Sequence, residues 1–130
     1  MEYKKSKEIS TFEDLFIWNC AIEFARSVYT VTEKSRIRSD FGLKSQIRAA
    51  SVSISSNIAE GFERRSRKEY LNFLNIAKGS AGEVRSQLFL AHRIGYLEDE
   101  DFELLRENAK LLSGSIANHM KSISRATPTS

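Results

Sequence analysis

Residues 57–69 read Asn-Ile-Ala-Glu-Gly-Phe-Glu-Arg-Arg-Ser-Arg-Lys-Glu, and this stretch joins two long amphipathic patterns through a short basic turn. Gly61 lies near the end of the first pattern, where a residue without a Cβ can adopt the positive φ that helix ends often use. Ser66 and Glu69 have the spacing of a capping box, in which each side chain bonds the backbone N–H of the other residue. The stretch therefore predicts a helix, a basic corner and a second helix.

Apolar residues recur at spacings of three and four on both sides of this corner, as an amphipathic helix requires. The upstream helix begins after Asp40, and the downstream helix runs from Arg67 to about Ile94. The expected core positions are Leu43, Ile47, Ala50, Ile54 and Ile58 before the corner, and Tyr70, Leu74, Ala77, Ala81, Val84, Leu88 and Ala91 after it. Gly79 and Gly82 fall inside the downstream helix, where we expect close packing to explain them.

Two further helices flank this pair. The first follows an N-cap at Thr11 and runs to about Ser35, and the last begins in the acidic run after Gly95. The first and third helices each carry a second apolar stripe, which indicates contact with another subunit. Short connectors place consecutive helices antiparallel. We therefore predict an all-α, up-down-up-down four-helix bundle over residues 11–124, with a mobile basic arm (1–10) and a frayed tail (125–130).

The composition of the 130 residues narrows the class of protein. Hydrophobic residues make up 41% and charged residues 28%, which suits one globular domain. The single cysteine, Cys20, can form no internal disulfide, and we expect a buried thiol in a reducing compartment. Lysine and glutamate interrupt the first residues, and no run of about eighteen apolar residues occurs. We therefore expect a cytoplasmic protein with no signal peptide and no membrane segment.

The residues that could carry chemistry are few. The two histidines, His92 and His119, and Cys20 are too few and too far apart by pattern to make a zinc site. No glycine-rich phosphate loop is present. We therefore expect no metal and no cofactor.

Motifs along most of the chain resemble one family, the helical-bundle proteins encoded by intervening sequences of bacterial large-subunit ribosomal RNA genes. The matching residues are Phe12-Glu13-Asp14-Leu15, Trp18, Ala21, Tyr29, Gly42-Leu43, Gln46-Ile47-Arg48-Ala49-Ala50, Ser53-Ile54, Asn57-Ile58-Ala59-Glu60-Gly61, Leu74, Ile76-Ala77-Lys78-Gly79-Ser80, Glu83, Gln87 and Gly95-Tyr96. One departure is local: Ile37 and Arg38 stand where the family usually has a Phe-Pro segment.

The resemblance implies a four-helix bundle that assembles into a ring of five subunits, with no known enzymatic activity. A related branch is the accessory variability determinant of diversity-generating retroelements, whose basic pentameric barrel is thought to engage a reverse transcriptase and nucleic acid. A reverse transcriptase, RNA or DNA is accordingly an expected partner by analogy.

Charges sort unequally between the two ends of the predicted bundle. Nine basic residues against five acidic ones give the corner end an excess of four: Lys4, Lys5, Lys7, Arg64, Arg65, Arg67, Lys68, Lys121 and Arg125 against Glu2, Glu8, Glu60, Glu63 and Glu69. The opposite end has five basic against seven acidic residues. In a ring this polarity makes a basic rim, which attracts phosphate backbones. We predict nucleic-acid binding by Arg64, Arg65, Arg67, Lys68, Lys121 and Arg125, and the alternative is an ordinary solvated corner.

Six polar residues of the matching motifs are expected to have structural roles: Tyr29, Gln46, Asn57, Glu60, Ser80 and Glu83. Counting from the two corners puts Tyr29, Gln46 and Glu83 at about one level. We predict that they form a buried or half-buried polar layer with Arg48 or Arg85, which fixes helix register or a subunit interface. Glu60 can instead pair with Arg64, four residues on.

Three functions follow from these observations. The leading one is a non-enzymatic, ring-forming protein whose basic end binds nucleic acid or a nucleoprotein. The second is a purely structural or protein-binding oligomer. The third is a ribonuclease of the HEPN type, because Arg85 and His92 lie seven positions apart on one helical face, where an arginine could hold a phosphate and a histidine transfer protons.

Overall fold

The computed structural model describes residues 9–125, and these form four long helices. They are α1 (Phe16–Lys34), α2 (Phe41–Glu63), α3 (Arg67–Arg93) and α4 (Asp99–Arg125), with two 3-10 turns, η2 (Phe12–Asp14) and η3 (Arg36–Ser39). Residues 9–125 contain no β-strand. The prediction of an all-α chain with four long helices is therefore confirmed. The expected basic arm lies mostly in residues 1–8, and the tail mostly in residues 126–130, both outside the described part.

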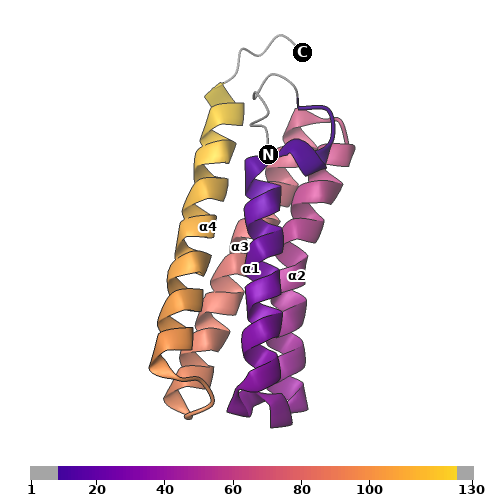
Figure 1. The fold of residues 1–130 in the computed structure, drawn as a ribbon. Coiled ribbons are helices and arrows are strands. Elements are labelled where there is room, and N and C mark those ends of the chain that lie inside the picture. The colour runs from indigo at the N-terminus through magenta and orange to yellow at the C-terminus, as the bar shows by residue number, and fades with distance from the viewer. Residues whose placement is uncertain (1–8, 126–130) are drawn as a thin grey trace, which may run out of the picture.

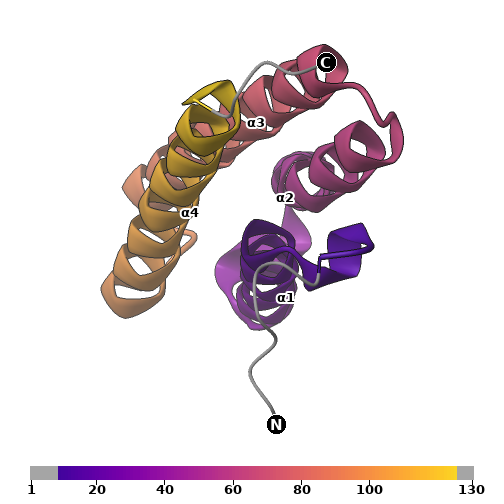
Figure 2. The ribbon, with the colours of Figure 1, turned by 90° about the horizontal axis from the view of Figure 1, so that it is seen from above.

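The four helices lie side by side, and successive helices are joined at alternate ends (Figure 1). The α2–α3 corner, the start of α1 and the end of α4 share one end, which we call the corner end. Among the four pairs of neighbouring helices, the contact between α2 and α3 is the most extensive, and that between α1 and α4 is the least. Viewed along the bundle, α4 diverges from α1 (Figure 2). The bundle is therefore tightest at its α2–α3 seam and loosest at its α1–α4 seam.

The core is built from the stripes that helical spacing predicts. On α2 and α3 every expected core position is buried except Leu43 and Tyr70, which are half-buried. Ile47, Ile54 and Leu88 are each fully buried. Helix α4 contributes Phe102, Leu105, Ala109, Leu112 and Ile116. The core is thus almost entirely aliphatic, and its burial is the main stabilising term of the fold.

The start of α1 differs from the expected start at Thr11. The Asp14 carboxylate accepts hydrogen bonds from the backbone N–H groups of Ser10 (2.9 Å) and Thr11 (3.1 Å). These bonds close the turn η2, and Leu15 is then extended, with φ −77° and ψ 130°. Helix α1 therefore begins only at Phe16, because a local side-chain bond competes with the helix.

Large apolar side chains remain on the surface of the single chain. Ile76 and Leu90 on α3, and Ile94 directly after that helix, are each about half exposed. On α1, Ile22 and Tyr29 are exposed, as the second stripe of that helix predicts. Stretches of this kind beside a complete core are typical of protein interfaces.

The structure does not support the reasons that we expected for glycine at three helical positions. Gly61 lies inside α2 and has no positive φ; the positive φ of the corner belongs to Arg65, at 60°. The expectation of a positive φ at Gly61 is therefore wrong. A Cβ at Gly61 would lie 2.6 Å from the Cβ of Phe73, so close approach of α3 requires glycine there. Around Gly79 and Gly82, in contrast, no atom of residues 9–125 beyond their own stretch of helix lies within 4 Å of a Cβ position, so close packing among the described residues does not explain them.

Candidate nucleic-acid interface

The corner between α2 and α3 places its basic side chains on a fixed scaffold. The Ser66 hydroxyl accepts from the backbone N–H of Glu69 at 3.2 Å and caps α3. The reciprocal half of the expected capping box is replaced, because the Glu69 carboxylate accepts from Arg64 at 3.1 Å. Arg65 turns the chain in a left-handed conformation that non-glycine residues seldom adopt.

Arg64 is bonded within the corner. Its guanidinium donates to Glu60 at 3.0 Å and to Glu69 at 3.1 Å, and it lies 5.0 Å from the centre of the Phe73 ring. The expected Glu60–Arg64 pair is thus present. Glu60 and Glu69 together raise the pKa of Arg64, with the Glu60 hydrogen bond as the largest cause. Of the predicted binding residues, Arg64 has its charge compensated inside the chain.

Three other corner cations line a shallow concavity of about 620 Å³. Its lining residues are Arg65, Ser66, Arg67, Lys68, Leu71 and Asn72. Arg65 and Lys68 are exposed and form no ion pair with any residue in 9–125. Arg67 donates to the backbone oxygen of Ser124 at 2.9 Å, which ties the start of α3 to the end of α4. This concavity, the corner concavity, holds three cations and no acid.

A second concavity of about 340 Å³ follows on the same side, between α3 and α4. Its lining residues are Asn75, Lys78, Ala117, Met120, Lys121, Ser124 and Arg125. The predicted Lys121 and Arg125 thus meet Lys78, which sequence reasoning missed. The signal was available: Lys78 lies eleven positions after Arg67, close to three helical turns, so both point to nearly the same side of α3. We call this the seam concavity.

The corner end as a whole is less basic than expected. Helix α1 starts there, so the turn η2 brings Glu13 and Asp14 to this end (Figure 1). Among residues 9–125, six basic residues then face five acidic ones: Arg64, Arg65, Arg67, Lys68, Lys121 and Arg125 against Glu13, Asp14, Glu60, Glu63 and Glu69. The remaining predicted cations, Lys4, Lys5 and Lys7, lie outside the described residues. Positive charge is therefore gathered on the α3–α4 side and not around the whole end.

The predicted polar layer does not form inside the chain. Gln46 and Glu83 are exposed, and Tyr29 is 43% exposed. Residues at the same height along the bundle can point in different directions, and the rotation of these helices turns the three side chains outward. A buried layer of these three residues is therefore wrong for the single chain, and their contact at a subunit interface stays a prediction.

Arg48 makes the polar link between α1 and α2 instead. It donates to the Thr32 hydroxyl at 2.8 Å and to the Glu33 carboxylate at 3.0 Å. Its guanidinium lies 4.3 Å from the centre of the Tyr29 ring. Arg48 lowers the pKa of Glu33 by its hydrogen bond, and Lys44 adds to this shift.

Asn57 and Ser80 belong to a small hydrogen-bonded group across the α2–α3 seam. The hydroxyls of Ser53 and Ser80 are 2.9 Å apart, and the Asn57 amide donates to the Ser53 hydroxyl at 2.9 Å. Short side chains let the helices approach closely while their polar atoms stay bonded. This geometry gives the two residues a structural role in helix register.

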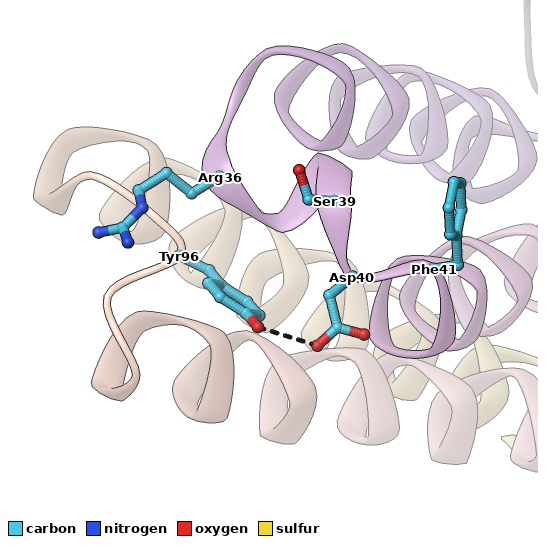
Figure 3. A pocket seen from close by; sticks show the side chains of 5 residues that line it. All are labelled: Arg36, Ser39, Asp40, Phe41 and Tyr96. Atoms are coloured by element: carbon cyan, nitrogen blue, oxygen red, sulfur yellow. Dashed lines mark hydrogen bonds between the residues drawn. The ribbon is translucent and has the colours of Figure 1, made fainter.

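The end opposite the corner holds an open pocket of about 510 Å³ between the two connectors (Figure 3). The Tyr96 hydroxyl donates to Asp40 at 3.0 Å, and the other Asp40 oxygen caps α2 by accepting from the Leu43 N–H. Arg36 and Phe41 lie on the two sides of this pair (Figure 3). Because both Asp40 oxygens are bonded, the carboxylate joins the two connectors and is not a free catalytic acid.

The arginine and histidine of the ribonuclease alternative are not arranged as a free pair. His92 Nε2 lies 2.7 Å from the Asp99 carboxylate, and its ring stacks on Phe102 at a centroid distance of 4.1 Å. These contacts hold the start of α4 against the end of α3. His92 therefore has a structural environment, because its Nε2 is bonded to Asp99 and its ring is packed on Phe102.

The other histidine, His119, makes a half-buried pair with Tyr70. The Tyr70 hydroxyl and His119 Nε2 are 2.8 Å apart, and the two rings meet edge to face. Burial lowers the pKa of His119 and raises that of Tyr70, because both charged forms lose water. The neutral pair is thus the form that the fold stabilises.

We expect the protein to lose stability on mild acidification because of His119. Its pKa is lower in the folded chain than in the unfolded chain, so the unfolded state binds more protons as the pH falls through about 6.5. The stabilising contribution is complete above that pH and is lost as the pH approaches the folded pKa. Urea unfolding at pH 7.5 and pH 5.5 measures the loss. His119→Gln should remove most of this pH dependence and His92→Gln should not; equal pH dependence in all three proteins would contradict the assignment.

Within residues 9–125, no three histidine, cysteine, aspartate or glutamate residues come together as metal ligands. The helices in this part of the chain are also too polar or too short to cross a membrane. Cys20 is half-buried beside the α1–α4 seam rather than fully buried, and burial raises the pKa of its thiol.

Comparison with known proteins identifies one family model and one solved structure to which the chain is similar. The family model of the 23S rRNA-intervening sequence protein matches residues 13–118. A crystal structure of a protein of unknown function from the S23 ribosomal protein family of Bacteroides thetaiotaomicron superposes with a TM-score of 0.74 and 25% sequence identity. The match covers 81% of this chain and 98% of that one. Among curated proteins, none matches the sequence.

Proposed function

Because the chain belongs to the 23S rRNA-intervening sequence protein family, we propose that it acts by binding and not by catalysis, as a ring of identical helical bundles. The ring has five subunits, by the resemblance given above, and its basic surface binds nucleic acid or a nucleoprotein. The proposed compartment is the cytoplasm, and a reverse transcriptase is a candidate protein partner by analogy. The similar protein from Bacteroides thetaiotaomicron is of unknown function, and the surfaces of this chain support the proposal.

Two separate apolar surfaces support ring assembly. One is a groove of about 450 Å³ between α1 and α4, where Phe16 is 72% and Leu111 60% exposed. The other is the exposed stripe of Ile76 and Leu90 on α3, continued by Ile94 at its C-cap. Contact between two different surfaces of one chain is heterologous, and such contacts close into rings when the rotation fits.

The single observation that carries nucleic-acid binding is the corner concavity. Arg65, Arg67 and Lys68 line it with no acidic residue among its walls. Cations gathered without acids gain by neutralising phosphates, since each contact releases condensed counterions. The contact is therefore expected to be strong at low salt and independent of sequence.

The second candidate is a protein-binding or purely structural oligomer. It is favoured by the near balance of charge at the corner end, where Glu60 and Glu69 compensate Arg64. It is also favoured by the exposed apolar surfaces, which suit protein partners. Salt separates the two candidates, because only phosphate binding falls steeply with it.

We expect the protein to bind mixed RNA and DNA in a salt-sensitive way through the corner. Arg65→Gly with Lys68→Ala removes two charges, and glycine suits the positive φ at position 65. This variant should fold normally and bind about tenfold more weakly at low salt. Native mass measurement gives the subunit number, and fluorescence anisotropy at about 50 and about 200 mM salt gives the affinity.

The matched control removes the same charge elsewhere. Arg26 and Lys44 lie on α1 and α2, away from both concavities. Arg26→Ala with Lys44→Ala should bind like the unchanged protein. A ring that binds neither RNA nor DNA would overturn the nucleic-acid proposal and favour the second candidate, and a monomer would overturn the ring.

A further inference from the structure

We infer that the ligand is a nucleic-acid duplex whose phosphate backbone lies lengthwise along the outer seam between α3 and α4. This inference rests on the proposed function, and it moves the centre of the binding surface from the corner to the α3–α4 seam. The contact surface extends from the corner concavity into the seam concavity, with Lys78 and Lys121 as central residues. In a ring this surface is part of the wall of each subunit and not only of its rim.

The two concavities share helix α3 and have the same chemistry. The corner concavity offers Arg65, Arg67 and Lys68, and the seam concavity offers Lys78, Lys121 and Arg125. Every other polar wall residue is a serine or an asparagine, which can also donate to phosphate oxygens. Neither concavity has an acidic lining residue. Six cations thus line the two concavities on one side of the described chain, and no acidic residue is among the lining residues.

The charge pattern of both helices continues this surface. Helix α4 carries no acidic residue after Glu107, although Lys110, Lys121 and Arg125 follow. Between Tyr70 and Arg93 the only acid of α3 is Glu83, which shares the face of Ile76 and Leu90 on the opposite side from α4. Repulsion among the seam cations is therefore unrelieved within the described chain, and an anionic partner relieves it.

Two glycines keep the seam flat beside these cations. Gly82 lies one turn after Lys78, and Gly114 lies two turns before Lys121. No atom of residues 9–125 comes within 4 Å of a Cβ at either position. Glycine inside an exposed helix is less favourable than alanine, because its backbone loses more conformational freedom on folding. Close approach of a partner's backbone, which a side chain would prevent, offsets that cost.

The other three seams carry apolar surface that suits subunit contacts. Phe16 and Leu111 are exposed at the α1–α4 seam, Ile76 and Leu90 on the α2–α3 side of α3, and Tyr29 beside Arg48 at the α1–α2 seam. Among residues 9–125, one large apolar ring is exposed on the α3–α4 side: Phe89, which packs edge to face on Phe102 at the far end. The half of this seam near the corner is therefore free for a polar ligand.

The same lining residues favour a duplex over a single strand. Neither concavity has an aromatic wall residue, so unpaired bases find no stacking surface. From Arg65 to Lys78 the surface extends about 20 Å, at about 1.5 Å per residue. A straight cationic surface of this length matches regularly spaced phosphates. We therefore expect duplex RNA or DNA to bind at least as tightly as a single strand of equal length.

The test compares charge reversal at the seam with charge reversal elsewhere. Lys78→Glu with Lys121→Glu should weaken duplex binding about a hundredfold at low salt and reduce the salt slope by about two. Arg26→Glu with Lys44→Glu carries the same change of charge and should have a much smaller effect. The probes are duplex RNA, duplex DNA, the two single strands and polyglutamate, and native mass is measured for each variant.

A charge-neutral variant gives a second readout. Gly114→Gln places a side chain on the flat surface and should weaken duplex binding severalfold without changing the salt slope. If the unchanged protein binds duplex and the seam variant matches the control, the seam is wrong and the corner proposal stands. If the unchanged protein binds no nucleic acid, both fail. Equal binding of polyglutamate, or loss of the oligomer in the seam variant, would overturn the inference in favour of an acidic protein or a subunit contact.

Discussion

Gly61→Ala is expected to destabilise the protein by about 2 kcal/mol, although it adds only one methyl group. The new Cβ would lie 2.6 Å from the Cβ of Phe73 and 3.2 Å from the Tyr70 ring. The Phe73 Cβ is fixed to the backbone of α3, so relief requires α2 and α3 to separate at their most extensive contact. Overpacking of this kind costs about 3 kcal/mol, and the better helix propensity of alanine offsets about 1 kcal/mol.

Gly82→Ala is the matched control for that substitution. It makes the same chemical change inside the next helix, where no atom of the described chain lies within 4 Å of the new Cβ. Only helix propensity acts there, so this variant should gain about 1 kcal/mol. Urea unfolding of the two variants should therefore give free energies that differ by about 3 kcal/mol. Equal stabilities would show that α3 does not approach α2 as closely as the structure has it.

The contrast between Gly61 and Gly82 shows which features of the fold the sequence predicts and which it does not. Periodicity predicted the buried positions of α2 and α3, apart from the half-buried Leu43 and Tyr70, because the 3.6-residue repeat depends on local sequence alone. Whether a position requires glycine depends on how closely another helix approaches it. The distance between two helices cannot be read from one sequence. The start of α1 was placed too early for a different reason: the Asp14 carboxylate bonds the backbone N–H groups of Ser10 and Thr11, and this local bond competes with the first helical turn that an N-cap at Thr11 predicts.

The sequence predicted which residues make up most of the candidate site, but it did not predict where they lie in the bundle. Five of the six predicted cations line the two concavities, and the sixth, Arg64, is held by Glu60 and Glu69. Lys78 was missed because its position relative to α4 depends on how α3 is rotated in the bundle. The same unknown rotation explains the wrong polar layer, since Gln46 and Glu83 can be level with each other and still face solvent.

Arg48→Ala is expected to lower the free energy of unfolding by about 2 kcal/mol, the second large effect. The substitution removes a hydrogen bond to the buried Thr32 hydroxyl and the contact of the guanidinium with the Tyr29 ring. A hydrogen bond from a charged group contributes about 1.5–3 kcal/mol when it is sheltered, and a cation–π contact at a partly exposed site about 0.5–1 kcal/mol. Because Arg48 is partly exposed, we expect the sum of these two contributions to lie near the lower limit of their ranges. Urea unfolding measures it directly.

The pKa of Glu33 distinguishes loss of this link from general loss of charge. Arg48, through its hydrogen bond, and then Lys44 hold that pKa below its ordinary value. Arg48→Ala and Lys44→Ala should therefore both raise the Glu33 pKa, as an NMR titration of its carboxyl carbon would show. Only Arg48→Ala should cost substantial stability, because Lys44 makes no hydrogen bond to α1 among the described residues. If both variants lose the same stability, charge in this region stabilises the fold and the Arg48–Thr32 bond does not join α1 to α2.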